Sequence, residues 1–197
     1  LFVSFFPQLV AGPIERATHL LPALVRERSV RLDQSLRGLH LILLGLFKKV
    51  AIANGVAQSV DSIYNSTHAA GAGDVALATL LFAVQINCDF SAYTDIARGS
   101  DLIENFRQPY FSTNPSEFWR RWHISLSTWL RDYLYIPLGG NRGSHGATYR
   151  NLMATMLLGG LWHGAAWNFV LWGAFHGSLL AIERWLGKKT AYDFLPR

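Results

Sequence analysis

One long stretch of the chain, residues 151–182, contains no Asp, Glu, Lys or Arg. As a single helix it would be about 48 Å long, which exceeds the roughly 30 Å hydrocarbon core of a bilayer. Gly159, Gly160 and Gly164 lie within it, and glycines are places where such a run can bend or break. The stretch therefore predicts a membrane-embedded segment made of two helical pieces or of one strongly kinked helix.

Two further apolar segments extend the prediction to an all-α, polytopic membrane protein. Residues 75–88 contain no charged side chain, and Leu and Ile recur at helical spacing along residues 38–64. The helix predicted over residues 38–64 carries Lys48 and Lys49. Because two lysines at the centre of a bilayer are costly, we expect their side chains to reach an interface or the helix to lie across it.

The segments outside these helices are of different kinds. Residues 1–22 carry Pro7 and an Ala-Gly-Pro sequence, a pattern that favours a bent or re-entrant segment over a straight helix. Residues 26–37 form a basic, amphipathic connector, and residues 65–74 form a loop of small side chains. Charged groups are thus concentrated between the apolar segments.

The sequence from Asn114 predicts the start of an amphipathic helix. Asn is a favoured N-cap, Pro115 suits the first helical position, and Glu117 suits the first turn. Large apolar side chains then recur along one stripe of this helix: Phe118, Trp122, Leu126, Trp129, Leu130 and Tyr133. Arginine and hydroxyl side chains fall largely elsewhere, so the helix suits a membrane interface. We expect it to end near Pro137, before a glycine-rich loop.

The overall composition narrows the class of partner. The formal net charge is +5, but Arg and Lys are dispersed and no nucleic-acid-binding motif is present, so nucleic acid is not the expected partner. Seven Trp, seven Tyr and twelve Phe are typical of chains that meet a membrane–water interface. Basic loops suit the cytoplasmic face of a membrane or an anionic ligand. The single Cys88 excludes an internal disulfide and a cysteine-based zinc site.

Two Trp-His pairs are the strongest candidates for chemistry. His163 lies inside the uncharged run, where burying an unpartnered polar ring is costly and where ionisable residues are commonly functional. Imidazole moves protons near neutral pH, so His163 and His123 are candidate catalytic residues. A histidine that only packs within the core explains the same spacing, and this structural role suits His176 best. Arg120 and Arg121 should lower the pKa of His123 and favour the neutral ring.

Other catalytic motifs fit the sequence poorly. Histidine spacings typical of metal sites are missing, so we expect no bound metal. Ser144 stands in Arg-Gly-Ser-His-Gly, which does not match the motif of serine hydrolases. The loop at residues 139–146 lacks the Gly-Lys-Ser/Thr of a phosphate-binding loop. Helix capping or pairing with Arg98 explains Asp89 and Asp95 as well as catalysis does.

Four segments together resemble one known family: residues 5–14, 89–97, 117–140 and 160–168. They are similar to the membrane-bound O-acyltransferase family, and most of all to its bacterial branch, which contains the membrane subunit of alginate O-acetylation and the D-alanyl transfer protein of teichoic acids. The resemblance covers nearly the whole chain, as one membrane domain over residues 1–197. Family members are considerably longer, so we expect an internal fragment whose flanking helices lie outside it.

This resemblance implies a fold, a reaction and a setting. The fold is a partial all-α core with re-entrant and interfacial amphipathic helices, within a multi-pass protein of the bacterial inner membrane. The reaction moves an acetyl group from a cytoplasmic thioester such as acetyl-CoA, a substrate rather than a bound cofactor, to a hydroxyl of an exported, alginate-like polysaccharide. A periplasmic partner that resembles acetyl esterases is implied as well, either as helper or as acceptor.

The resemblance also implies roles for individual residues. His163 falls on the near-invariant catalytic histidine of the family. His123 falls on a second characteristic position, which is His in this branch and Asn in many eukaryotic relatives. Four further positions are expected to bind substrate: Trp119, Asp132, Trp162 and Asn168.

Three alternatives stay open on the sequence. The acyl group could be D-alanine transferred to teichoic acid. The chain could be a non-catalytic conduit or scaffold for the acyl donor, or part of a transporter. In addition, the segment between Asp95 and Asn105 is shorter than the family pattern, which could disturb how residues 107–116 present the catalytic helix.

Overall fold

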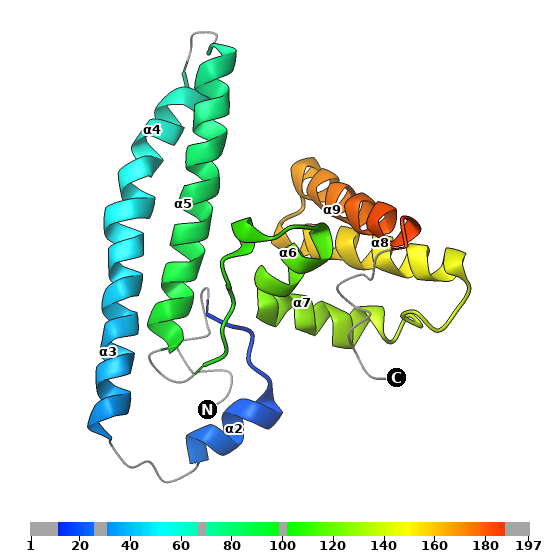
Figure 1. Cartoon of the computed structure of the whole chain (residues 1–197), viewed down its shortest axis with the longest axis horizontal. Coiled ribbons are helices and arrows are strands. Elements are labelled where there is room, and N and C mark those ends of the chain that lie inside the picture. The colour runs from blue at the N-terminus through cyan, green and yellow to red at the C-terminus, as the bar shows by residue number, and fades with distance from the viewer. Residues whose placement is uncertain (1–11, 26–30, 67–69, 99–101, 188–197) are drawn as a thin grey trace. The chain divides into compact units, whose positions relative to one another are not determined.

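The computed structural model describes residues 12–25, 31–66, 70–98 and 102–187. Within these residues all regular secondary structure is helical, which confirms the predicted all-α class (Figure 1). The chain divides into two compact units, Leu1–Glu104 and Asn105–Arg197. Each unit is described by itself below, and the single membrane domain over residues 1–197 stays a prediction.

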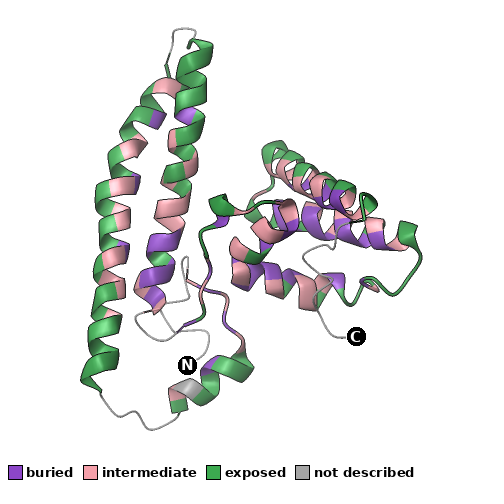
Figure 2. Ribbon diagram, viewed as in Figure 1, coloured by how far each residue is buried: buried purple, intermediate pink, exposed green. Residues whose placement is uncertain are grey.

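A helical hairpin dominates the first unit. One arm is continuous through α3 (Leu32–Phe47), the π-helical turn η1 (Lys48–Ala53) and α4 (Asn54–Tyr64), and the other arm is α5 (Ala72–Arg98). Both predicted helices are confirmed, and each begins earlier than predicted. Both arms, Leu32–Tyr64 and Ala72–Arg98, are long and apolar enough to cross a membrane. The buried side chains of α5 gather towards its C-terminal end, while most of the hairpin surface is exposed or intermediate (Figure 2).

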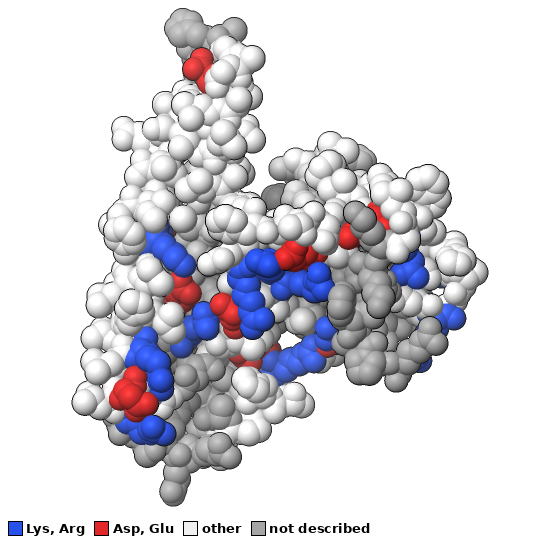
Figure 3. All heavy atoms as spheres, in the orientation of Figure 1, with Lys and Arg blue, Asp and Glu red and all other residues white. Residues whose placement is uncertain are grey.

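Ion pairs join the two arms of the hairpin. Lys48 Nζ lies 2.6 Å from Asp95 Oδ2, and Lys49 Nζ lies 2.6 Å from Asp89 Oδ1. The two aspartates therefore pair mainly with lysines, although Arg98 lies 3.9 Å from Asp95. On the face drawn in Figure 3, charged side chains of the first unit lie mainly towards one end of the hairpin. Pairing lets two lysines lie in a largely apolar stretch of helix without leaving their charges isolated.

The segment before the hairpin is only partly described. Residues 1–11, which hold Pro7 of the predicted re-entrant segment, lie outside the described residues. The chain then forms α2 (Ala17–Val25), which contains Pro22. Leu20 of this helix packs in a small buried cluster with Ala97 and Leu102. The shortened segment after Asp95 is also incomplete, because residues 99–101 lie outside the description.

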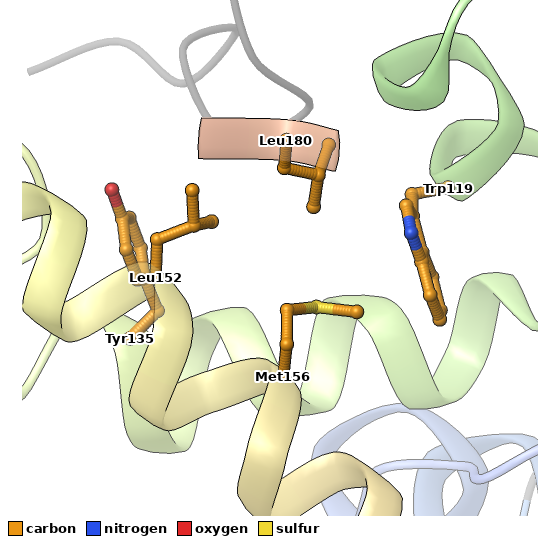
Figure 4. Packing of buried hydrophobic residues seen from close by; sticks show 5 residues of the cluster. All are labelled: Trp119, Tyr135, Leu152, Met156 and Leu180. Atoms are coloured by element: carbon orange, nitrogen blue, oxygen red, sulfur yellow. The ribbon is translucent and has the colours of Figure 1, made fainter. Parts of the chain in front are cut away.

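The second unit packs short helices against a helix pair. Its elements are η2 (Pro109–Phe111), α6 (Pro115–Arg121), α7 (Ile124–Leu130), η3 (Arg131–Tyr135), α8 (His145–His163) and α9 (Trp167–Trp185). The buried core joins Trp119, Tyr135, Leu152, Met156 and Leu180. In Figure 4 the Met156 side chain extends towards Trp119, and Tyr135 lies beside Leu152. This core fixes α6 and η3 against the α8–α9 pair.

The predicted start of α6 is confirmed. The Asn114 side chain accepts a hydrogen bond from the Glu117 backbone N–H at 2.8 Å, and Pro115 is the first helical residue. Glu117 in turn accepts from the backbone N–H and the hydroxyl of Thr113, at 2.8 and 2.7 Å. These bonds, with Arg121 nearby, lower the pKa of Glu117 to about 2. The carboxylate is therefore charged at neutral pH and suits the positive end of the helix.

The expectation of one continuous amphipathic helix beyond Asn114 is wrong. Helix α6 ends at Arg121 and α7 begins at Ile124, so Trp122 and His123 lie in a break between two short helices. The predicted apolar stripe is divided accordingly: Leu126 and Leu130 are buried, whereas Trp129 and Tyr133 are exposed. The cause is a left-handed backbone at His123, which local sequence spacing does not reveal.

The uncharged run forms two helical pieces, which is the first of the two predicted alternatives, and not one kinked helix. Helices α8 and α9 are separated by Gly164–Ala166, rather than by the Gly159-Gly160 pair. Glycines let the two helices touch through their backbones. A Cβ atom at Gly160 would lie 2.3 Å from the Phe169 backbone oxygen, and one at Gly173 would lie 2.5 Å from the Met156 backbone oxygen.

We expect Gly160→Ala to destabilise the protein by about 1–3 kcal/mol, because a methyl group there must push α8 and α9 apart. Gly146→Ala in the first turn of α8 is the matched control, since nothing lies within 4 Å of its added Cβ. Thermal unfolding of the intact protein in detergent measures both variants. Equal midpoints for the two would contradict the close helix contact.

Candidate active site

His123 occupies an unusual backbone position. It is the N-cap residue of α7 with φ 44° and ψ 52°, and besides Gln108 it is the one non-glycine residue with positive φ in the described ranges. Apart from glycine, Asn, Asp and His are the residues most enriched in this left-handed region. The turn directs the imidazole inward, and the residue is only 3% exposed.

The segment of residues 105–107 lies beside this turn. The Asn105 backbone oxygen accepts from the Ile124 N–H at 3.0 Å, and its side-chain oxygen accepts from the Ser125 N–H at 2.9 Å. The Arg107 N–H donates to the Arg121 backbone oxygen at 2.9 Å. The segment therefore crosses the break between α6 and α7 and contacts the chain on both sides of it.

The second Trp-His pair lies at the end of α8 and faces the first. The ring centroid of His163 is 6.4 Å from that of His123, and the Trp162 ring is 6.2 Å from His123. His163 itself is exposed, in contrast to buried His123. Two histidines forty positions apart in the sequence are thus neighbours, one inside the unit and one at its surface.

Aromatic rings continue from His163 into the core. The Trp172 ring lies 5.4 Å from His163 and 4.7 Å from His176. His176 stacks on Phe118 at 5.7 Å and meets Trp119 edge-on at 5.2 Å. Sequence reasoning gave His176 a structural role and overlooked Trp172, although the two lie one turn apart on one face of α9. We call the set His123, Trp162, His163, Trp172, His176, Phe118 and Trp119 the ring cluster.

The structure places the four predicted substrate-binding residues differently. Trp119 and Trp162 belong to the ring cluster, and the buried Trp119 Nε1 has no hydrogen-bond acceptor within the described part of the chain. Asn168 is exposed in the first turn of α9, next to Phe169, whose ring lies 6.0 Å from His163. Asp132 lies in η3 rather than in the ring cluster, and its carboxylate accepts from Arg131 Nε at 2.6 Å.

Burial sets the protonation of His123. Loss of hydration, followed by the charge of neighbouring His163, lowers the pKa of His123 from 6.5 to about 3. The direction agrees with the sequence prediction, but the cause is burial rather than the adjacent arginines. The His123 ring is therefore neutral at physiological pH.

The structure also bears on Ser144 and on a metal site, neither of which the sequence favours. The Ser144 hydroxyl caps α8 by accepting from the Ala147 N–H at 3.2 Å. Among the residues that the structure describes, no group of three His, Cys, Asp or Glu side chains could hold a metal ion.

We expect His123→Asn to retain most of the native stability and His123→Val to lose about 1–3 kcal/mol more, because a β-branched residue is strained in the left-handed region. Thermal unfolding of both variants in detergent measures the difference. A Val variant as stable as the Asn variant would contradict the left-handed turn.

The low pKa of His123 also predicts an acid sensitivity. Between pH 6.5 and about 3 the unfolded chain binds a proton at this residue and the folded protein does not, so stability falls as the pH falls through this window. His123→Asn should make the unfolding midpoint less dependent on pH between 7 and 5. His145→Asn, at an exposed histidine, is the control for the loss of a histidine. Parallel slopes for wild type and His123→Asn would contradict burial of a neutral ring.

The chain is similar in sequence to known acyltransferases. The model of the MBOAT, membrane-bound O-acyltransferase family, matches residues 1–195. A probable alginate O-acetylase of Azotobacter vinelandii is 51% identical over 189 residues, which are 93% of this chain and 38% of that protein. A peptidoglycan O-acetyltransferase of Helicobacter pylori is 42% identical, over 93% of this chain and 36% of its own length.

A more distant relative is named for a different acyl group. A teichoic acid D-alanyltransferase of Bacillus subtilis is 31% identical over 99% of this chain and 53% of its own length. The chain thus spans about 40% of the length of the alginate and peptidoglycan relatives, and about half of the D-alanyl one.

Proposed function

Because the chain belongs to the membrane-bound O-acyltransferase family, we propose that it carries the catalytic histidines of an enzyme that moves an acetyl group from a cytoplasmic thioester to a hydroxyl of an exported polysaccharide. The observation that carries the proposal is the approach of the two Trp-His pairs, with imidazole centroids 6.4 Å apart. Acetyl is favoured over D-alanyl because the relatives named as O-acetyl transfer proteins are 42–51% identical and the D-alanyl relative is 31% identical.

His163 is the proposed general base. Its exposed ring can be reached by a hydroxyl and a thioester from outside the unit. The neutral imidazole takes the hydroxyl proton as the oxygen attacks the thioester carbonyl. The tetrahedral intermediate then collapses, the C–S bond breaks, and the departing thiolate takes the proton back from His163. The products are an ester and a free thiol such as coenzyme A.

His123 has a different proposed role, because it is buried and neutral. A neutral ring beside His163 can orient the donor or stabilise the proton that His163 gains, without adding a like charge next to it. Three aromatic rings also lie near His163, those of Trp162, Phe169 and Trp172. Because these aromatic neighbours carry no charge, they neither add a proton to the His163 ring nor hold one on it, and the ring can exchange its proton with the substrates.

Substrate contacts are proposed for four side chains. The buried Trp119 indole N–H suits an oxygen of the donor, since a buried donor without a partner is costly. Trp162 is 56% exposed beside both histidines and offers a face for an acyl or sugar group. The exposed Asn168 amide suits a polar part of either substrate. For Asp132 the support is the family resemblance alone.

The proposed setting is the bacterial inner membrane, crossed several times by the whole protein. The two candidate spans support membrane insertion, and their exposed apolar side chains suit contact with lipid or with further helices. The re-entrant N-terminal segment, acetyl-CoA as donor, the polysaccharide acceptor and a periplasmic partner resembling acetyl esterases belong to the same proposal. The names of the relatives, which act on alginate, peptidoglycan and teichoic acid, support a cell-envelope polymer as acceptor.

We expect His163→Ala in the full-length protein to lower acetyl transfer by about 10²–10⁴-fold while leaving membrane insertion intact, because the general base is lost. His145→Ala at the opposite, exposed end of the same helix is the matched control and should retain full activity. Transfer of labelled acetyl from acetyl-CoA to the polysaccharide, in membranes that contain the protein and its partner, measures both.

The same assay separates the alternatives. Full transfer by the His163→Ala protein would overturn the assignment of the base. Full transfer by a variant lacking both His123 and His163 would indicate an acyl conduit that leaves the chemistry to a partner. Incorporation of labelled D-alanine in place of acetyl would assign the other acyl group, and export of an unmodified substrate would indicate a transporter.

A further inference from the structure

The turn that carries His123 depends on a residue outside both neighbouring helices. Asn105 is completely buried, at 0% exposure. Its two oxygen atoms accept hydrogen bonds from the Ile124 and Ser125 N–H groups, at 3.0 and 2.9 Å. These are the two N–H groups that directly follow the left-handed residue, so one asparagine fixes the backbone where the catalytic segment changes direction.

These bonds replace the cap that His123 does not provide. The first N–H groups of a helix have no partner within the helix and need one from elsewhere. His123 stands at the N-cap of α7, but its side chain makes no capping hydrogen bond. The Asn105 side chain supplies the missing acceptor from another part of the chain. The His123 ring is therefore released from capping and lies towards Trp162 and His163.

Neighbouring contacts hold Asn105 in place. Two residues later, the Arg107 N–H donates to the Arg121 backbone oxygen at the end of α6. The ring of Phe106 between them meets Trp122 edge-on at 5.1 Å and lies 6.3 Å from His123. Three successive residues thus contact the chain before, at and after the break between the helices.

We propose that Asn105 is a positioning residue, which caps α7 in place of His123 and so aims the His123 imidazole at His163. The inference rests on the proposed function, in which the two histidines serve one acyl transfer. A small displacement of a catalytic group is enough to lower a rate by up to about 100-fold. Asn105 therefore acts on the rate through the placement of His123 and not through contact with the substrates.

The kinetic test is a double-mutant cycle in the full-length protein. Asn105→Ala removes the side-chain acceptor and should lower kcat by about 10–100-fold with KM for acetyl-CoA nearly unchanged. Asn105→Asp keeps an oxygen at the same place and should recover most of the lost rate. In a His123→Ala background, Asn105→Ala should lower the rate no further, because the group it positions is already gone.

Asn151→Ala is the matched control for the loss of a buried asparagine. Asn151 is 2% exposed and donates to the Gly140 backbone oxygen at 3.3 Å, far along the chain from the His123 turn. Any effect of this variant, per amount of folded protein, should be the same factor with His123 present or absent. If Asn105→Ala also lowers the rate by the same factor in both backgrounds, the positioning role is overturned.

A second test reads the position of residue 123 without any acyl transfer. His123→Cys and His163→Cys are combined in a protein whose other cysteines, Cys88 among them, are replaced by Ser. A short thiol-bridging fluorophore should link the two cysteines readily, and adding Asn105→Ala should slow the linkage at least several-fold, whereas Asn151→Ala should not. Unchanged linkage with Asn105→Ala would overturn the positioning role. Slowed linkage together with full activity of His123→Ala would instead overturn the proposed function of His123.

Discussion

The left-handed backbone at His123 is the constraint on which the rest of the candidate site depends. With an ordinary helical backbone there, α6 and α7 would form one amphipathic helix with His123 among its surface arginines. The turn at φ 44° interrupts that helix and buries the ring. Such a conformation costs of order 1 kcal/mol or more and persists only where surrounding contacts fix it. The bonds from Asn105 to Ile124 and Ser125 are contacts of this kind.

His163, the neighbour of His123, is positioned by a different interaction, which is the close contact of α8 and α9. Gly160 and Gly173 let the two backbones touch, so Trp172 on α9 lies beside His163 at the end of α8 and also contacts His176. The same helix pair is tied back to α6 by a buried carboxylate: Glu183 accepts from the Ser116 N–H at 3.0 Å and from its hydroxyl at 2.6 Å. Helices α6, α8 and α9, which carry most of the ring cluster, therefore hold one another in place.

Sequence reasoning succeeded where the signal is local. The cap at Asn114 and the division of the uncharged run follow from residue types at short spacing. The break at His123 could not be predicted in this way, because the residues from Phe118 to Leu130 have helical periodicity and the interrupting bonds come from the distant Asn105. The partners of Lys48 and Lys49 were missed for the same reason, since they depend on the register of two antiparallel helices. The histidines were candidates because of their apolar surroundings and their chemistry, and family resemblance supplied the roles proposed for them.

The two units show two ways of keeping ionisable groups in apolar surroundings. In the hairpin, Lys48 and Lys49 meet carboxylates at 2.6 Å. At the candidate site, aromatic rings lie beside His163, and burial keeps His123 neutral. A carboxylate beside these rings would favour the protonated imidazole, which could not act as the base in the proposed acyl transfer. The aromatic neighbours carry no charge, which is consistent with the proposed proton exchange at His163.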